Sequence, residues 1–155
     1  MTDETRSAGT PEVELLSFRL GEQEYSVDIM SVREIRGWTR ATPLPHAPSH
    51  IRGVINLRGN VLPVVDLSTR LGMAPVEGDP RNVIIVVHLG NQVAGLLVDA
   101  VSDIIALPRS DLQAPPALGA DGANSCIEAI TIVEGRMIRV LNLGGVFPSG
   151  ERDAA

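Results

Sequence analysis

Short apolar runs separated by turn-forming residues dominate the pattern of the chain. GVINL and VLPVVDL lie on either side of Arg58-Gly59-Asn60, and VIIVVHL and QVAGLLV lie on either side of Gly90-Asn91. Apolar runs of this length that meet at Gly and Asn are typical of β-hairpins. The chain holds roughly nine or ten such strands and one or two short helices, so the pattern predicts an all-β protein.

The two runs of the first hairpin are continuously apolar, which indicates burial on both faces. A sheet with one face in water alternates apolar and polar residues, whereas the strands of a small barrel can be buried on both sides. We expect Gly59-Asn60 to form the left-handed turn, and Pro63 to mark an edge, a bulge or a corner. The polar segment APVEGDPRN separates the first half of the chain from a second half of similar character. The sequence therefore predicts two small barrels in one chain.

Two short helical segments are predicted beside these strands. Ile29, Val32 and Ile35 are three positions apart, as on a helical turn, but apolar and charged residues also alternate from Val32 onward, as in a strand. A helical turn that runs into a strand reconciles both patterns. The segment LSTRLG is expected to form a second short helix, which Asp66 or Ser68 can cap.

The remaining segments set the predicted domain boundaries. Residues 1–12 are polar and lack periodicity, so we expect a disordered N-terminal tail, followed by one domain over 13–147 and a flexible C-terminal tail over 148–155. The proline-rich and glycine-rich stretch 108–125 predicts a long irregular loop that is either mobile or functional. Gly144-Gly145 argues against a helix near the end of the domain.

Composition and charge narrow the possible functions. The net charge is −6, all thirteen basic residues are arginine, and aromatic residues make up 3% of the chain, so we expect no binding to nucleic acid. The single cysteine, Cys126, excludes an internal disulfide, and the N-terminal segment does not resemble a signal peptide, which predicts a cytoplasmic protein. The longest apolar runs are too short to span a bilayer, so we expect no direct membrane insertion.

No set of residues predicts catalysis, a metal or a cofactor. His46 and His50 are four positions apart, as in a helical metal site, but Pro48 prevents that helix, and the other ligands that zinc needs are not nearby. No neighbouring base is evident for Cys126, which we expect to be a small core residue. The glycine-rich GADGAN does not follow a strand, so it does not predict a phosphate loop.

Charged residues inside the apolar segments are the main candidates for an interaction site. Glu34 lies next to Ile35 in the sequence, and Arg58 lies at the hairpin turn. One interpretation is an ordinary solvated face. The other is that Glu34 and Arg58 form an ion pair and orient a recognition patch beside Ile29, Val32 and Ile35, an exposed apolar strip that could hold a partner helix.

Three longer segments resemble one protein family. FRLGEQEYSVDIMSVREIRG, IRGVINLRGNVLPVVDL and VAGLLVDAVSD are similar to the CheW family, the coupling proteins of bacterial chemotaxis. The resemblance runs in the same order from Val13 to about Leu143. The length favours a stand-alone coupler over the histidine kinase CheA, whose regulatory domain is similar, and over CheV, which adds a receiver domain.

The resemblance implies a cytoplasmic adaptor built from two SH3-like five-stranded β-barrels. Such a protein would couple methyl-accepting chemotaxis receptors to CheA in signalling arrays, and would reach the membrane through these partners. It also implies a hydrophobic groove between the barrels that takes the helical tip of a receptor. The implied groove residues are Ile29, Val32, Ile35 and Val101, with Glu34 and Arg58 nearby. We predict no residues for the kinase contact.

Two other functions remain open on the sequence alone. The chain could be a paralogous coupler in a chemosensory pathway that does not control flagella. It could also be a small β-barrel enzyme or ligand-binding domain with its pocket between the barrels. An enzyme pocket should contain converging acidic, histidine or cysteine side chains, whereas the groove of a coupler should be mainly aliphatic.

Overall fold

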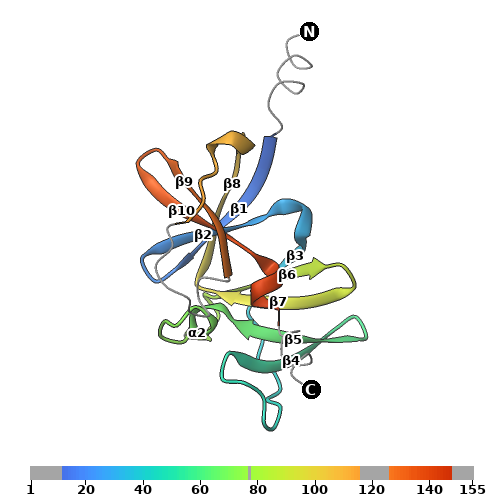
Figure 1. Ribbon diagram of the computed structural model, residues 1–155. Coiled ribbons are helices and arrows are strands. Elements are labelled where there is room, and N and C mark those ends of the chain that lie inside the picture. Colours follow the sequence, from blue (N-terminus) through green and yellow to red (C-terminus); the bar gives the residue numbers. More distant parts are fainter. Residues whose placement is uncertain (1–11, 77, 116–125, 148–155) are drawn as a thin grey trace.

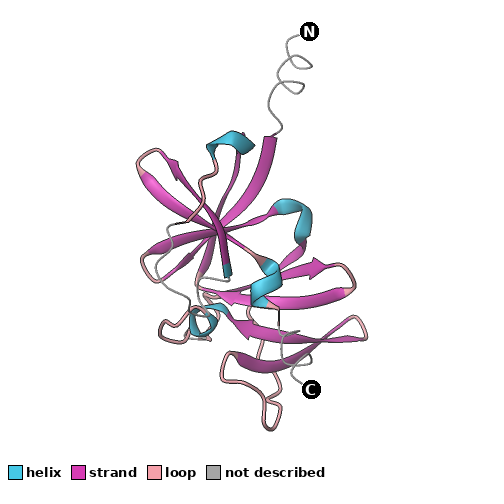
Figure 2. Cartoon of the chain, viewed as in Figure 1, coloured by secondary structure: helices cyan, strands magenta, loops and turns pink. Residues whose placement is uncertain are grey.

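Ten strands form two five-stranded sheets in the computed structural model, which describes residues 12–76, 78–115 and 126–147. Figure 2 shows that strands make up most of the chain and that the helices are single turns. The predicted all-β fold of two five-stranded barrels is confirmed. The tails predicted at 148–155 and over nearly all of 1–12, and residues 116–125 of the predicted loop, lie outside the described residues.

We call the two sheets barrel A and barrel B (Figure 1). Barrel A has the strand order β8-β1-β2-β10-β9, and barrel B has the order β3-β6-β7-β5-β4. The strands of barrel A are β1 (Glu12–Leu20), β2 (Gln23–Asp28), β8 (Ala100–Pro108), β9 (Ile127–Val133) and β10 (Arg136–Leu141). Those of barrel B are β3 (Val32–Gly37), β4 (Ile51–Leu57), β5 (Asn60–Asp66), β6 (Val83–Leu89) and β7 (Gln92–Val98). The helical turns are η1 (Ile29–Ser31), α2 (Leu67–Arg70), η2 (Arg109–Asp111) and α3 (Leu143–Val146).

The polar segment APVEGDPRN suggested that each half of the sequence forms one barrel. The structure shows a different division of the chain. Barrel B is formed by the continuous middle of the chain, whereas barrel A combines β1 and β2 with the last three strands. The polar segment lies inside barrel B, between β5 and β6. This error arises because strand pairing over long sequence separations leaves no mark in local patterns.

In each sheet, the segment that follows one edge strand (β3 or β8) pairs with the opposite edge strand (β4 or β9) and closes the barrel. In barrel B, Thr42 and Val54 exchange two backbone hydrogen bonds of 2.8 and 2.9 Å. In barrel A, Gln113 and Ile130 exchange two of 2.8 Å. These bridges continue the ladder beyond β4 and β9 and satisfy backbone groups that would otherwise be left at open sheet edges.

The hydrophobic core has two parts of unequal size. A large cluster fills barrel B and continues between the barrels, where Leu16, Phe18 and Leu20 of β1 contribute to it. A small cluster inside barrel A includes Val13 and Leu15, which point from the opposite face of the same strand. Burial of β1 on both faces thus joins the two barrels into one unit.

A hairpin followed by a helical turn occurs in both barrels. β4, β5 and α2 correspond residue for residue to β9, β10 and α3, with the same spacing along the chain. The turn Arg58-Gly59 has φ angles of 52° and 89°, and its counterpart Glu134-Gly135 has 52° and 79°. The prediction of Gly59-Asn60 as the left-handed pair was therefore wrong by one residue. Leu57 pairs with Asn60 and closes the turn, so the two residues between them take the positive φ angles.

Of the two helical turns that follow these hairpins, one was predicted. Asp66 caps α2 and accepts a hydrogen bond from the Thr69 amide, as expected. The expectation of no helix at Gly144-Gly145 was wrong. Asn142 caps α3 by accepting a bond from the Gly144 amide, and Leu143 and Val146 are buried. Capping and burial outweigh the cost of about 1 kcal/mol for each glycine.

Candidate protein-binding surface

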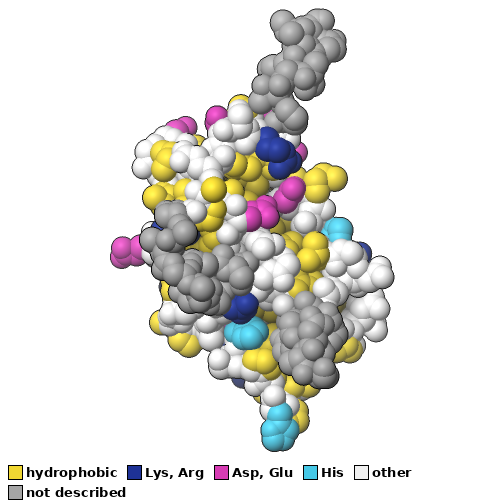
Figure 3. Space-filling model, in the orientation of Figure 1, with side chains coloured by type: hydrophobic (Ala, Val, Ile, Leu, Met, Phe, Trp, Pro, Cys, Tyr) yellow, Lys and Arg dark blue, Asp and Glu magenta, His cyan; other side chains and the backbone are white. Residues whose placement is uncertain are grey.

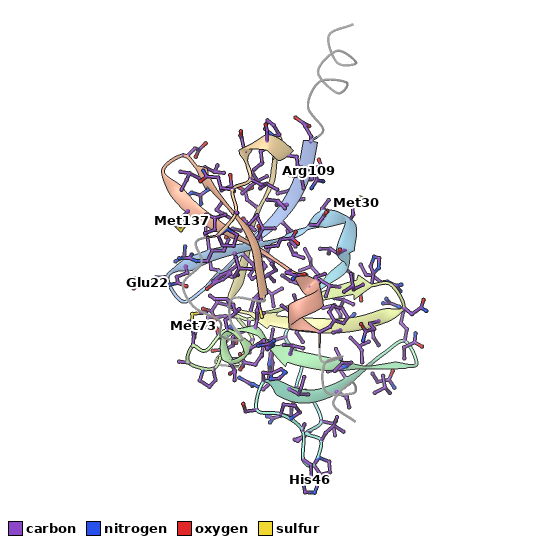
Figure 4. The ribbon with its side chains drawn as sticks, in the orientation of Figure 1. Glu22, Met30, His46, Met73, Arg109 and Met137 are labelled. Carbon is purple, nitrogen blue, oxygen red and sulfur yellow. The ribbon has the colours of Figure 1, made fainter. Side chains whose placement is uncertain are left out.

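The segment between β2 and β3 forms the predicted helical turn that runs into a strand. The Asp28 side chain accepts a hydrogen bond of 2.9 Å from the Met30 amide and caps η1. β3 begins directly afterwards at Val32. The short turn projects Met30 into solvent (Figure 4). Ile29 and Val32 pack against the large core cluster.

The four predicted apolar groove residues differ in exposure. Ile29, Val32 and Val101 are half-buried and pack against the large core cluster. Ile35 is 48% exposed on β3. The structure therefore brings the first three to the margin of one core, which reaches from barrel B to the junction with β8.

Two further exposed apolar residues lie on the elements that carry Ile29 and Val101, and neither was predicted. Met30 is 78% exposed at η1, and Ile104 of β8 is 59% exposed. Ile104 lies opposite Leu16, and Val101 lies opposite Phe18, so both point to the face of β1 that packs toward barrel B. Hydrophobic side chains are exposed over both barrels in Figure 3. The apolar pattern of a sequence does not show which apolar residues the neighbouring strands leave exposed. No sequence signal therefore distinguished Met30 and Ile104 from buried apolar residues.

The predicted ion pair between Glu34 and Arg58 is present. Arg58 Nη2 lies 3.1 Å from Glu34 Oε1 and donates a hydrogen bond to it. Arg36 Nη1 lies 3.6 Å from the other carboxylate oxygen, Oε2. The pair joins β3 to the turn of the β4–β5 hairpin.

This ion pair is not on the same face of β3 as Ile35. Glu34 lies opposite Val86 of β6, and Ile35 lies opposite Ile85. Neighbouring residues of a strand point to opposite faces, so Glu34 points to the interior side of barrel B while Ile35 points outward. The expectation that the pair lies beside the apolar strip on one surface is corrected to two surfaces that share one strand.

The Glu34 face borders a cleft of about 510 Å³ between the β4–β5 and β6–β7 hairpins. Its apolar lining includes Leu57, Leu62 and Val86, which are all buried, and Glu34 contributes the cleft's carboxylate. The rest of the lining is largely polar and includes Arg33, Arg58, Asn60 and Asn91, so this cleft inside barrel B is not the aliphatic groove expected between the barrels. The described residues contain no group of three His, Cys, Asp or Glu that could hold a metal ion, and no described helix is long and apolar enough to cross a membrane.

Comparison with known proteins identifies the family. Residues 14–151 match the model of the CheW-like domain. The chain is 55% identical over 142 residues to the chemotaxis protein CheW of Rhizobium meliloti, covering 92% of both chains. It is 46% identical to a probable chemotaxis protein CheW of Rhizobium etli over the full length of both. The crystal structure of the scaffolding protein TtCheW from Thermoanaerobacter tengcongensis superposes with a TM-score of 0.78 at 33% identity, covering 84% of each chain.

The family match, the relatives and the fold agree with the resemblance seen in the three sequence segments. The solved relative TtCheW is named a scaffolding protein. The chain belongs to the CheW family of chemotaxis adaptor proteins.

Proposed function

We propose that this protein couples methyl-accepting chemotaxis receptors to the histidine kinase CheA. It would work in the cytoplasm and be recruited to receptor arrays at the membrane by these partners. Membership of the CheW family supports the role, and the apolar surface between the barrels supports the receptor contact. A coupler acts by linking two binding equilibria rather than by accelerating a reaction.

The receptor would dock on a surface that we call the junction patch. It consists of Ile29, Met30, Val32, Ile35, Val101 and Ile104. The exposure of Met30 and Ile104 at the edge of a core shared by both barrels is the observation that carries this assignment. Amphipathic helices lay an apolar face on such surfaces, and the two-helix tip of a receptor has that form.

Glu34 and Arg58 would hold the strand that the receptor contacts in position relative to the β4–β5 hairpin. The Arg58 side chain is 67% exposed, so the pair contributes little to folding, about 0 to 1 kcal/mol. Reversal of the charge at Arg58 should therefore disturb signalling more than thermal stability. A compensating reversal at Glu34 should partly restore signalling, whereas additive losses would show that the two residues act separately.

Size-exclusion chromatography tests the receptor contact. The protein is mixed with a cytoplasmic receptor fragment or with the CheA regulatory domain of the same organism. Met30→Asp should abolish co-elution with the receptor fragment and retain co-elution with the kinase domain, because it places a charge where the receptor helix docks. Val32→Asp should have the same effect with some loss of stability.

Ile132→Asp is the matched control, since Ile132 is 53% exposed on β9 and lies outside the junction patch. It should leave receptor binding unchanged. Equal loss of binding in Met30→Asp and Ile132→Asp would count against the patch. A folded wild-type protein that binds neither partner would remove the proposed function itself.

A further inference from the structure

The parallel ladder between the two hairpins has three residue pairs in each barrel but begins at a different position along the hairpins. In barrel A, β10 pairs with β2 from Ile138 and Glu24 onward. In barrel B, β5 pairs with β7 from Val64 and Gly95 onward. By the correspondence of the two hairpin units, Ile138 is equivalent to Leu62, so barrel B lacks the first two pairs of this ladder. Its hairpins separate into a fork, and both free ends project on the same side (Figure 1).

Side chains hold the corresponding position closed in barrel A. Arg136 donates two hydrogen bonds of 2.9 and 2.8 Å to the carboxylate of Glu24. The Arg139 guanidinium lies 5.4 Å from the centre of the Tyr25 ring. Both pairs connect β10 to β2 across the line where the hairpins meet.

Barrel B has different residues at these positions. Asn60 replaces Arg136 and Val93 replaces Glu24, while Pro63 replaces Arg139. A proline has no N–H to donate, so β5 cannot form the ladder bond toward β7 that an ordinary residue forms there. The opening is thus a property of these residues and not a requirement of the barrel.

Main-chain groups line the fork. Val54 uses its N–H and its carbonyl on Thr42, so the pair of Val54 with Pro63 is not hydrogen-bonded, and Pro63 faces β7. Val61 lies two positions earlier and presents its N–H and carbonyl in the same direction. Among the described pairings, β7 reaches β5 only from Gly95 onward, which leaves the Val61 groups facing the cleft.

The cleft provides side-chain contacts as well. Leu57, Leu62 and Val86 form its apolar floor. Glu34 also lines the cleft, and its carboxylate is held by Arg58 Nη2 at 3.1 Å and by Arg36 Nη1 at 3.6 Å.

We propose that this fork, formed by residues 57–63 and 91–93, binds an extended segment of a partner protein as an added β-strand. The main chain of the segment pairs with the free groups of Val61. One apolar side chain of the segment packs on the apolar floor formed by Leu57, Leu62 and Val86. Addition of a strand to an unpaired edge is a common mode of peptide recognition, in which main-chain bonds give affinity and side-chain pockets give specificity.

The probe is a library of short random peptides displayed on phage and selected on the immobilised full-length protein. Peptides that also bind the Val93→Phe variant are removed, because the added ring fills the cleft from β7. The affinity of the recovered synthetic peptides is then measured by fluorescence anisotropy. Loss of one or two main-chain hydrogen bonds in Val61→Pro should weaken binding about tenfold or more. Ile132→Phe, on the exposed face of barrel A, should not change it.

Pro63→Val separates closure of the fork from unfolding. Valine restores the missing N–H, so β5 should pair with β7 two residues earlier, as β10 does with β2. We expect peptide binding to be lost while the midpoint of thermal unfolding stays the same or rises. In the wild type, the Val61 amide should exchange rapidly with solvent and become protected when a peptide is bound.

Recovery of no peptide that depends on the cleft would overturn the proposal. So would peptides that bind without protecting the Val61 amide, or that bind Pro63→Val as tightly as the wild type. None of these results depends on the receptor or kinase, so the coupling function and the fork are tested separately.

Discussion

The hairpin and helical turn of barrel B have the same backbone arrangement as those of barrel A, but the two units contain different side chains. Barrel B has a glycine at position 53, a buried carboxylate at 66 and a proline at 63. Barrel A has Ala129, Asn142 and Arg139 at the corresponding positions. One topology is therefore stabilised by two different sets of contacts, and the differences show which contacts serve the fold and which open a surface.

The interiors of the two barrels are also filled by different kinds of side chain. Barrel B is filled by large aliphatic residues such as Leu62, Ile84 and Leu97. The inside of barrel A has the paired serines Ser17 and Ser26, which are both fully buried. A small, partly polar interior gains less from burial of apolar surface. Barrel A accordingly uses ion-pair and cation–π contacts across its strands, whereas barrel B can leave its hairpins apart.

Among the substitutions that compare the two barrels, Gly53→Ala should lower the free energy of unfolding most. Gly53 has a φ of 145°, and a Cβ there would lie 2.1 Å from the Thr42 carbonyl oxygen, which forms the bridge that closes barrel B. Backbone strain and overpacking together should lower the free energy of unfolding by roughly 4 kcal/mol. Urea denaturation measures this loss. The reverse change in barrel A, Ala129→Gly, should cost about 1 kcal/mol or less. Similar losses in both variants would show that the closures are not different.

Asp66→Ala should have the next largest effect. Asp66 is fully buried, accepts bonds from the Thr69 and Val76 amides, and lies 3.1 Å from Arg52 Nε. Its removal leaves these donors unsatisfied and should cost about 3 kcal/mol in urea denaturation. Asn142→Ala removes the equivalent cap of α3 and should cost about 1 kcal/mol. A larger loss in Asn142→Ala would reverse the ranking of the two caps.

Arg136→Met compares the two ion pairs. Glu24 is 7% exposed, so loss of Arg136 leaves a buried carboxylate without its partner and should cost about 2 kcal/mol. Arg58→Met breaks the more exposed pair with Glu34 and should cost less than about 1 kcal/mol. Thermal unfolding of the two variants under identical conditions measures both losses. Equal shifts in the unfolding midpoint would contradict the role of Arg136 in holding the hairpins of barrel A together.

Tyr25→Phe should have the smallest effect at neutral pH, where it removes the hydrogen bond from the Tyr25 hydroxyl to Gln23 Oε1, and it should have a further effect in alkali. Burial raises the pKa of the Tyr25 phenol above its ordinary value, although the positive charge of Arg139 acts in the opposite direction. The folded state therefore favours the neutral phenol, and the associated stability is present below the ordinary pKa of about 10 and is lost as the pH rises through the folded-state value. The wild type should lose stability between about pH 8 and about pH 11. The variant should lose less, as measured by urea unfolding at both pH values. If stability falls equally in the variant and in the wild type, titration of other groups causes the loss.

Local patterns predicted the elements of this fold better than their arrangement. The apolar runs around Arg58-Gly59 and Gly90-Asn91 identified hairpins, because strands and tight turns have short-range signatures. The α3 turn was missed because its cap and its buried residues act only once β10 is in place. The combination of β1 with β8 was unpredictable from local patterns, since it depends on contacts between residues 81 to 96 positions apart.

The candidate site shows the same limit. The ion pair of Glu34 and Arg58 was predicted from charged residues within apolar segments and is present. The prediction that the pair lies on the same face of β3 as Ile35 was wrong, because pairing with β6 decides which face of β3 is covered. Met30 and Ile104 were missed for the same reason, since their exposure depends on how η1 and β8 pack against the rest of the molecule.

A coupler must bind a receptor and the kinase at the same time, and we expect this protein to do so through separate surfaces. Light scattering coupled to size-exclusion chromatography of the protein with both a receptor fragment and the CheA regulatory domain tests it directly. We expect a single particle with the mass of all three components, which loses only the receptor fragment in Met30→Asp. Displacement of one partner by the other would contradict the coupling function, because a coupler whose partners exclude each other cannot link them.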